Sequence, residues 1–287
     1  MGTIDYRHVI ETQQQDWNRV AAGWEKWDAL LDQNLAFVNY RLLGDARIRP
    51  GQRVVDVGSG TGYPALLAAQ AVGPHGRVQG FDLAEAMLDR ARCKAQRLGL
   101  SNVTFQAADA TTLPIGTDFI DAVISRFCLM FLPDIPKAVG EIMRVLVPGA
   151  YVAAAVWSAP DRNPFLKIPM DVLKTMIELP PPDPEQPGIF RLAAAGDLAS
   201  IMSRAGLPDV RDDEIIGEAR FDSPQQYLES VMDQAAPLQA LFARLTEAQR
   251  REAQQAILRA AEAYQRGQHV RMPMAIRIVS ARKERVG

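Results

Sequence analysis

A glycine-rich turn is the feature of this sequence best suited to chemistry. Residues 54–66 read VVDVGSGTGYPAL, so an apolar run leads directly into Gly58, Gly60 and Gly62 and then into a helical stretch. Glycines allow such a turn to be tight, and they let backbone N–H groups approach a ligand at the helix N-terminus. The turn therefore predicts a ligand site between a strand and a helix.

The spacing of the glycines bears on which ligand is bound. The dinucleotide fingerprint G-x-G-x-x-G has its last glycine one position after Gly62, and this chain has Tyr63 there. A bulky side chain does not suit the close helix–strand packing that this glycine provides. The spacing is therefore an argument against a dinucleotide pyrophosphate.

Two acids follow the glycine turn at the positions that a nucleoside would need. Asp82 ends the second apolar run, twenty residues after Gly62, where a carboxylate can accept hydrogen bonds from both ribose hydroxyls. Asp109 ends the third run, where a carboxylate can accept from an adenine amino group. Either acid alone could equally form a turn or cap a helix. Together with the glycine turn they predict a nucleoside site at the carboxyl ends of the strands.

The elements that position these residues alternate in type. Between residues 53 and 157, apolar runs alternate with amphipathic stretches, which predicts βαβ units and a parallel sheet covered on both faces. We expect a Rossmann-like, doubly wound, mostly parallel seven-stranded α/β sheet with helical cap insertions. The predicted strands are 53–58, 77–82, 102–109, 119–125, 150–157, 208–216 and 270–281, with helices near 63–72, 84–98, 135–146 and 195–205.

The pattern of apolar runs, amphipathic stretches and proline-rich loops divides the chain into six segments. The run at 179–188 is too proline-rich for a helix interior or a central strand, so it marks an insertion. The expected segments are an N-terminal helical lid at 1–45, a cofactor-binding core at 46–157, a cap insertion at 158–194, a core helix and strand at 195–216, a helical cap insertion at 217–268 and a final core strand at 269–287.

The series of motifs resembles the class I S-adenosylmethionine (SAM)-dependent methyltransferases, most closely those of the ubiquinone/menaquinone-biosynthesis type. The resemblance rests on DVGSGTG, FDLAEAML, AADATTLP, FIDAVISRFCLMFLPD and EIMRVLVPGAYV, in this order between residues 53 and 157, with AAGWEKWD near residue 24. It implies SAM as the cofactor and S-adenosylhomocysteine (SAH) as the product.

The resemblance also implies twelve cofactor contacts. From the methionine end to the adenine they are Arg126 and Phe127, then Asp56, Gly58, Gly60 and Gly62, then Asp82 at the ribose, Leu83 and Met87 beside the adenine, Asp109 and Ala110 at the adenine edge, and Trp24 as an aromatic residue near SAM. For Trp24, filling the core from an apolar helix face is an equally good interpretation.

Methyl transfer from a sulfonium is an in-line displacement that depends mainly on positioning and on a dry cavity. Whether a general base is needed depends on the acceptor, so the catalytic residues are left open. His8 and His269 lie in cap segments and are weak candidates for a base, with a surface or structural role as the alternative. No metal is expected, since the two cysteines are too few for a thiolate cluster.

The amino-acid composition limits the kinds of molecule that the protein is expected to bind. A formal net charge of -2 offers no bulk attraction to nucleic acid, and no apolar run is long enough to span or insert into a membrane. With only two cysteines, a cytoplasmic location is the simplest expectation. We expect a small, largely apolar acceptor, a quinone precursor or a secondary metabolite methylated on oxygen or carbon, against Met and Phe side chains of the cap. Homo-oligomerisation through the tryptophan-rich N-terminal helices is a further possibility.

Three other functions stay open. The chain could bind SAM without transferring a methyl group, as in a cyclase-like enzyme, or it could be an NAD(P)-dependent oxidoreductase on the same fold. It could also be a non-catalytic module whose cap recognises a protein.

Overall fold

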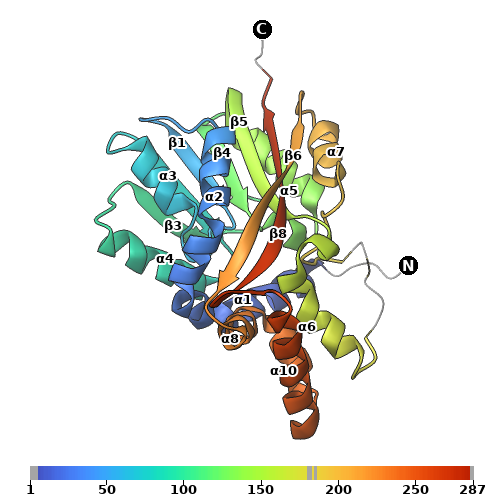
Figure 1. Ribbon diagram of the computed structural model, residues 1–287. Helices are drawn as coiled ribbons and strands as arrows, with labels where there is room; N and C mark the ends of the chain where they lie inside the picture. The colour runs from blue at the N-terminus through green and yellow to red at the C-terminus, as the bar shows by residue number, and fades with distance from the viewer. Residues whose placement is uncertain (1–5, 180–182, 184–185, 285–287) are drawn as a thin grey trace.

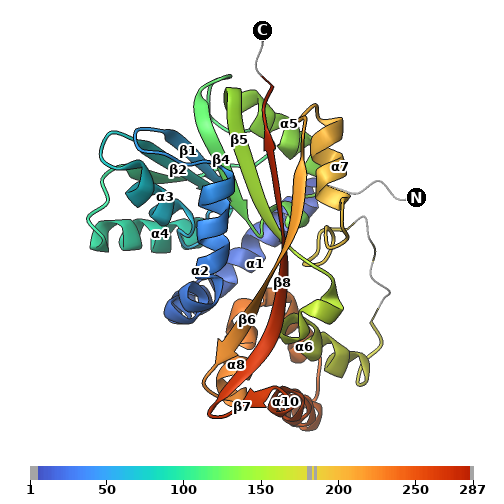
Figure 2. The ribbon, with the colours of Figure 1, turned by 45° about the horizontal axis from the view of Figure 1, so that its top comes forward.

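A central twisted sheet with helices on both faces organises the molecule (Figures 1 and 2). The computed structural model describes residues 6–179, 183 and 186–284, so part of the proline-rich run at 179–188 lies outside the described residues. The strand order is β3-β2-β1-β4-β5-β8-β6. The strands are β1 (Arg53–Val57), β2 (Arg77–Asp82), β3 (Val103–Ala107), β4 (Ile120–Arg126), β5 (Leu146–Trp157), β6 (Arg211–Phe221), the two-residue β7 (Gln265–Arg266) and β8 (His269–Arg282).

The register confirms the expected mostly parallel sheet. The first five strands pair in parallel, and β8 runs antiparallel to its neighbours β5 and β6. The short β7 pairs with β8 and adds an eighth strand to the seven expected. Strand β1 lies between β2 and β4, so the chain changes direction across the sheet at β1. Open α/β sheets bind ligands at this point, beyond the carboxyl ends of the strands.

Helices cover both faces because each presents one apolar stripe to the sheet. Helix α5 follows the rule closely: Asp134 caps its first turn by accepting from the Lys137 N–H at 2.9 Å, and Val139 and Ile142 are buried. The helices are α1 (Tyr6–Lys26), α2 (Asp28–Asp45), α3 (Ala65–Val72), α4 (Glu85–Arg97), α5 (Ile135–Val145), α6 (Pro164–Lys174), α7 (Asp197–Arg204), α8 (Pro224–Gln234), α9 (Ala236–Ala243) and α10 (Glu247–Glu262), with short 3₁₀ turns η1 (Leu129–Phe131) and η2 (Pro160–Arg162). None of the helices among the described residues is both long and apolar enough to cross a bilayer.

A second hydrophobic core lies below the sheet in Figure 1. It forms where α6, α8 and α10 pack around the lower ends of β6 and β8, with Tyr227 fully buried among them. The boundary expected at residues 216/217 falls inside β6, because the ladder between β6 and β8 continues without a break to Phe221. The buried Ala219 and Phe221 at the end of β6 belong to this second core.

Buried Asn163 fastens the segment after β5 to strand β8. Its Nδ2 donates to the carbonyls of Ser158, Ala159 and Ala275 at 3.0–3.2 Å, and its Oδ1 accepts from the Ala275 N–H at 2.9 Å. Changing Asn163 to Ala is expected to lower the free energy of unfolding by about 3 kcal/mol, because buried backbone groups lose their partners. Urea unfolding would measure the loss. Asp161→Ala, at a side chain that is 85% exposed, should change the same quantity by less than about 0.5 kcal/mol. Equal effects of the two changes would contradict this role.

Candidate active site

A cavity of about 870 Å³ opens at the carboxyl ends of β1, β2 and β4. The glycine turn and the residues after β2 and β4 form its floor and sides, and helix α1 lies across it. Its lining combines apolar and aromatic side chains with a few polar groups, as in small-molecule and cofactor sites. The cavity occupies the position where the fold predicts a ligand.

Hydrogen bonds to the neighbouring strand hold the glycine turn open. The N–H groups of Gly58 and Ser59 both donate to the Phe81 carbonyl, at 2.8 and 2.9 Å. Gly58 has φ +73°, and a Cβ at this position would overlap the side chain of Cys128. Gly60 has φ +50°, and a Cβ at this position would meet no atom within 4 Å, so the turn leaves free space on its cavity side. The backbone can therefore approach a bound molecule closely.

The carboxylate of Asp82 joins the glycine turn to the end of β2. Its Oδ2 accepts from the Gly60 N–H and its Oδ1 from the Ala84 N–H, each at 2.9 Å. Burial raises the pKa of this carboxyl above its ordinary value, and the three backbone N–H groups that donate to it oppose the rise. Asp82 lines the cavity and keeps acceptor capacity on both oxygens. It can therefore accept hydrogen bonds from a pair of ligand hydroxyls.

Buried Asp56 and half-buried Arg126 carry opposite charges beside the turn. Asp56 is completely buried behind the cavity wall. Its Oδ2 accepts from the Ala65 N–H at 3.0 Å, and its Oδ1 has no hydrogen-bond partner among the described residues. Burial raises the pKa of Asp56 to about 7, and the Arg126 charge opposes this rise. Arg126 does line the cavity and donates to the Asn39 Oδ1 at 2.7 Å, while burial lowers its pKa to about 10. The cavity thus has a guanidinium at one end.

The raised pKa of Asp56 predicts a pH dependence of stability. In the unfolded chain an Asp titrates near about 3.9. The folded protein therefore holds the extra proton between about pH 4 and pH 7, and stability is lost as the pH rises through that window. In Asp56→Asn, which keeps an acceptor for Ala65, this loss should vanish. The free energy of unfolding of the variant relative to wild type should rise by about 2–4 kcal/mol from pH 4 to pH 8.

Urea unfolding at both pH values measures this difference. Asp89→Asn, at an acid that is 60% exposed on α4, serves as the control. A difference for Asp56→Asn that is the same at pH 4 and pH 8 would show that Asp56 titrates normally.

Aromatic side chains form the roof and the far wall of the cavity. Phe127 stacks on Trp157 with ring centroids 4.1 Å apart, and Trp17 meets the edges of Phe131 and Trp24 at 5.3 and 6.1 Å. Trp17, Trp24, Phe127 and Phe131 all line the cavity. This end of the site is therefore apolar and suited to a flat, hydrophobic molecule.

Helix α1 is tied to both sides of the cavity by polar side chains. Gln13 Nε2 donates to the Phe131 carbonyl at 2.7 Å, and Gln14 Nε2 donates to the Leu83 carbonyl at 2.9 Å. Asn18 accepts from the Ala86 N–H at 2.9 Å. Gln13 and Trp17 were not predicted as site residues. The apolar face of this helix included Trp17, but nothing in the sequence told which surface the face would cover.

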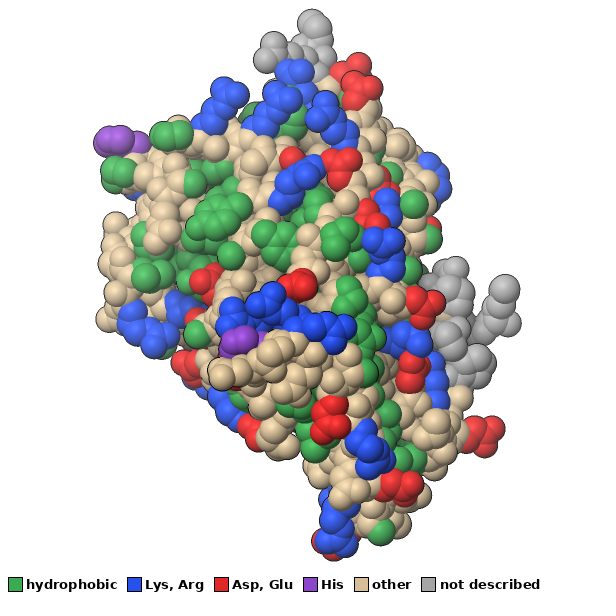
Figure 3. Space-filling view, in the orientation of Figure 1, with side chains coloured by type: hydrophobic (Ala, Val, Ile, Leu, Met, Phe, Trp, Pro, Cys, Tyr) green, Lys and Arg blue, Asp and Glu red, His purple; other side chains and the backbone are tan. Residues whose placement is uncertain are grey.

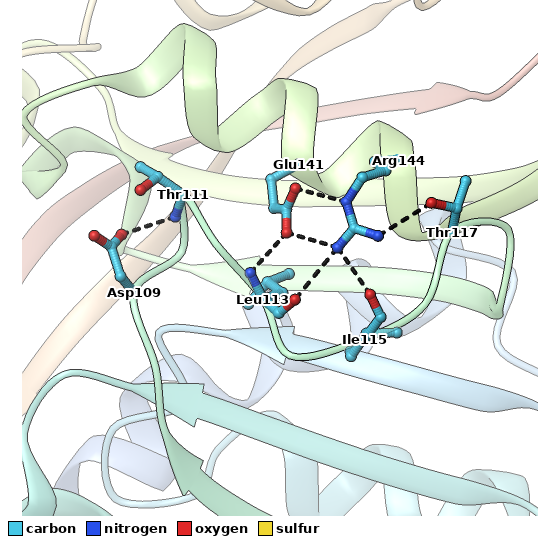
Figure 4. A network of polar contacts seen from close by, with 7 residues as sticks. All are labelled: Asp109, Thr111, Leu113, Ile115, Thr117, Glu141 and Arg144. Carbon is cyan, nitrogen blue, oxygen red and sulfur yellow. Dashed lines mark hydrogen bonds and ion pairs between the residues drawn. The ribbon is translucent and has the colours of Figure 1, made fainter.

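Nine of the twelve predicted contacts line the cavity, and three do not. The nine are Trp24, Gly58, Gly60, Asp82, Leu83, Met87, Ala110, Arg126 and Phe127. Asp56 lies behind the wall, and Gly62 packs closely against Leu66 and Ala91. The Oδ1 of Asp109 accepts a hydrogen bond from the Thr111 N–H at 2.8 Å, as an aspartate that forms a turn does (Figure 4). Its contact with a cofactor remains a prediction.

A network on α5 fixes the loop that presents Ala110 to the cavity. Glu141 accepts from the Leu113 N–H at 2.7 Å, and Arg144 donates to the Ile115 carbonyl at 2.8 Å and to Glu141 (Figure 4). The Arg144 guanidinium holds the pKa of Glu141 below its ordinary value. The loop after β3 is thus held by a helix more distant in sequence, which sequence patterns did not indicate.

The two histidine candidates lie away from the cavity. His8 is exposed on α1. His269 starts β8 in the second core region, with Nε2 2.6 Å from Arg220 Nη2 and Nδ1 3.4 Å from Asp222 Oδ1. Neither lines the cavity, and neither do the methionines and phenylalanines of the cap. The apolar walls come from α1 and from the segment after β4 instead, because Phe242, Met272 and Met274 fill the cores.

The tryptophan strip of the N-terminal helices packs within the chain. Trp17 and Trp24 line the cavity, and Trp27 Nε1 donates to Asp233 Oδ2 on α8 at 2.8 Å. Trp24 Nε1 donates to the Gln234 carbonyl at 3.1 Å. An oligomer contact through these rings would have to use the edges that remain exposed.

A family comparison agrees with this geometry. Residues 48–178 match a family model described as "Methyltransferase domain". This part of the chain is thus matched as a methyltransferase domain, as the series of motifs predicted. The match spans β1 to β5 and includes the glycine turn, Asp82 and Arg126. Helix α1, which covers the cavity of this methyltransferase domain, lies outside it.

Two curated proteins are similar in sequence to the part of this chain that contains the methyltransferase domain. The chain is 36% identical over 168 residues to the ubiquinone/menaquinone biosynthesis C-methyltransferase UbiE of Vibrio vulnificus, covering 58% of this chain and 65% of that protein. It is 38% identical over 133 residues to the 2-phytyl-1,4-naphtoquinone methyltransferase of Synechococcus elongatus, covering 44% of this chain and 57% of that protein. The chain thus spans less than two thirds of the length of either relative.

A solved structure confirms the fold over a larger part of the chain. The YcgJ protein of Bacillus subtilis superposes with a TM-score of 0.57 at 20% identity, over 88% of this chain and 100% of that one. At this identity the match establishes the fold alone.

Proposed function

We propose that this protein transfers a methyl group from SAM to a small, largely apolar acceptor. The observation that carries the proposal is the Asp82 carboxylate, which meets the Gly60 N–H at the floor of a cavity roofed by aromatic rings. A carboxylate beside a glycine turn suits a nucleoside ribose. The aromatic end beyond it suits an acceptor that must be kept from water.

The residues of the cavity fit SAM along its whole length. SAM supplies an electrophilic methyl group on a sulfonium. Asp82 would accept from the ribose hydroxyls, with Leu83 and Met87 against the adenine. The Arg126 guanidinium would attract the carboxylate at the methionine end, which is where a positive side chain is useful.

The acceptor is proposed to be a quinone precursor or a similar flat metabolite, methylated on carbon or oxygen. Two relatives carry quinone names, and the walls near Phe127 and Phe131 are aromatic. Among the described residues that line the cavity, Asp82 is the only acid and no histidine is present. An acceptor that ionises readily, such as a phenol or quinol, would attack without a protein base.

Helix α1 is proposed to act as a lid over the bound cofactor. The side chains of Gln13 and Gln14 donate hydrogen bonds to backbone carbonyls at opposite sides of the cavity. The double variant Gln13→Ala/Gln14→Ala should lower kcat about tenfold, because the reacting groups are held less well, while the Kd for SAH changes less. Steady-state kinetics and calorimetry would separate the two quantities. An unchanged kcat would rule out the lid.

The direct test supplies methyl-labelled SAM together with a panel of quinols, phenols and amines. Transfer of label to a quinol or phenol, with SAH formed in equal amount, is the expected result. SAH binding without transfer to any acceptor would favour the cyclase-like alternative. NADH binding in place of SAH would favour the oxidoreductase.

A further inference from the structure

A second hollow lies at the opposite edge of the sheet from the cavity. It is formed where β1 and β5 begin and β8 ends. Three arginines line it together with Tyr151, Gln52 and Asp121: they are Arg47, Arg49 and Arg282. Figure 3 shows Lys and Arg side chains gathered at the top of the molecule, above the sheet and beside the end of β8.

The positive charge of this hollow is not compensated within the described part of the chain. Asp121 is committed to Arg53, with two side-chain contacts of 3.0 Å. Arg47, Arg49 and Arg282 form no ion pair with any described residue. Arg282 donates through Nε to the Gly149 carbonyl at 3.1 Å, which leaves its two Nη groups available. Three guanidinium groups therefore line one hollow in which the acid among the described lining residues, Asp121, is already paired with Arg53.

Two of these arginines are held in place by the same ring. The guanidinium carbons of Arg47 and Arg282 lie 4.4 and 5.8 Å from the centroid of Tyr151. Such cation–π contacts orient the groups, but they also keep two like charges close together. An anion between them would relieve the repulsion.

The backbone conformation of Arg47 is a further sign that its side chain has a role in the hollow. Arg47 follows the end of α2 with φ +51°, in the left-handed region where glycine is usual after a helix. The Ile48 N–H donates a hydrogen bond to the Leu43 carbonyl at 3.0 Å, and this bond completes the turn that ends the helix. An arginine in place of glycine is a strained choice, and strain of this kind points to a use for the side chain.

We propose that this hollow binds a phosphate or diphosphate group of a soluble small molecule. Guanidinium groups bind phosphate oxygens through paired N–H donors, and three of them suit more than one negative charge. Because the hollow and the cavity lie at opposite ends of the strands, the ligand is not the methyl acceptor. The site is a separate one, and it stands whether or not methyl transfer is established.

The test is calorimetric titration of the full chain with inorganic pyrophosphate at low ionic strength. We expect saturable binding that weakens at least tenfold in Arg47→Gly and in Arg282→Gln. Arg47→Gly suits the left-handed turn, so it should fold normally, and a thermal melt checks this. Arg259→Gln, at an exposed arginine on α10, is the matched control and should bind as wild type does.

A second arm separates the possible sources of the phosphate group. Sedimentation with vesicles containing about 30% phosphatidylglycerol would report a lipid headgroup. Pyrophosphate binding lost in the two hollow variants but not in Arg259→Gln supports the proposal. Absence of saturable binding, equal binding by all variants, or binding to vesicles without binding of free pyrophosphate would overturn it. SAH titrated into the same variants tests the methyltransferase cavity independently.

Discussion

Changing Asp82 to Ala is expected to weaken the binding of SAH by about 100- to 10,000-fold. The carboxylate would hold two ribose hydroxyls, and each charge-assisted hydrogen bond contributes about 1.5–3 kcal/mol. The same carboxylate accepts from the N–H groups of Gly60 and Ala84, so its removal also frees the glycine turn. Methyl transfer should fall at least as far as binding, because the cofactor would no longer be positioned.

Calorimetry with SAH measures this loss, and circular dichroism checks that the variant folds. Asp89→Ala is the matched control, since Asp89 lies on the exposed side of α4 and pairs with Arg92. Asp82→Asn keeps one acceptor oxygen and should recover part of the affinity. SAH binding that is unchanged in Asp82→Ala would refute the proposed position of the ribose, and the methyltransferase proposal would lose its main support.

Changing Gly58 to Ala is expected to lower the free energy of unfolding by about 2–5 kcal/mol. The residue has φ +73°, where a side chain costs about 1–2 kcal/mol. The new Cβ would also overlap the Cβ and Sγ of Cys128, and crowding of this kind costs about 1–3 kcal/mol. The protein should also lose SAH binding, because the backbone of the turn would have to move away from β4.

Two further variants separate the causes. Gly44→Ala lies inside α2 with no atom near the new Cβ, and it should raise stability by about 0.5–1 kcal/mol. Adding Cys128→Gly to Gly58→Ala removes the overlap and should return part of the loss, while the backbone strain remains. Urea unfolding provides all three values. A Gly58→Ala protein as stable as wild type would mean that the turn and the segment after β4 are farther apart than described.

The strands and helices of the core could be predicted because each carries a local pattern. Apolar runs such as the one before Gly58 are buried on both faces in a parallel sheet, and the amphipathic stretches between them bury one side. The length of β6 could not be predicted. Its alternating polar residues continue as a strand to Phe221 only because β8, from the other end of the chain, pairs with it throughout.

The cofactor side of the site was predicted better than the acceptor side. Asp82 and the glycines lie at strand ends, and the sheet brings such ends together wherever the fold forms. Asp56 belongs to the same motif, yet its side chain lies behind the cavity wall. The sequence could not predict this, because a local pattern does not specify which face of β1 the cavity uses. The apolar residues of the cap were expected at the acceptor, but several of them fill cores instead.

The sequence by itself determined the parallel sheet, the glycine turn and the acid after β2, because these depend on short-range pattern and on spacing along one βαβ unit. Only the tertiary structure decided what closes the cavity. Helix α1 meets the core through Gln13, Gln14 and Asn18, which contact segments 68 to 118 residues away. The three arginines of the second hollow likewise come from the end of α2, the approach to β1 and the end of β8. Contacts between segments so far apart depend on how packed elements meet in space, and no local pattern carries that information.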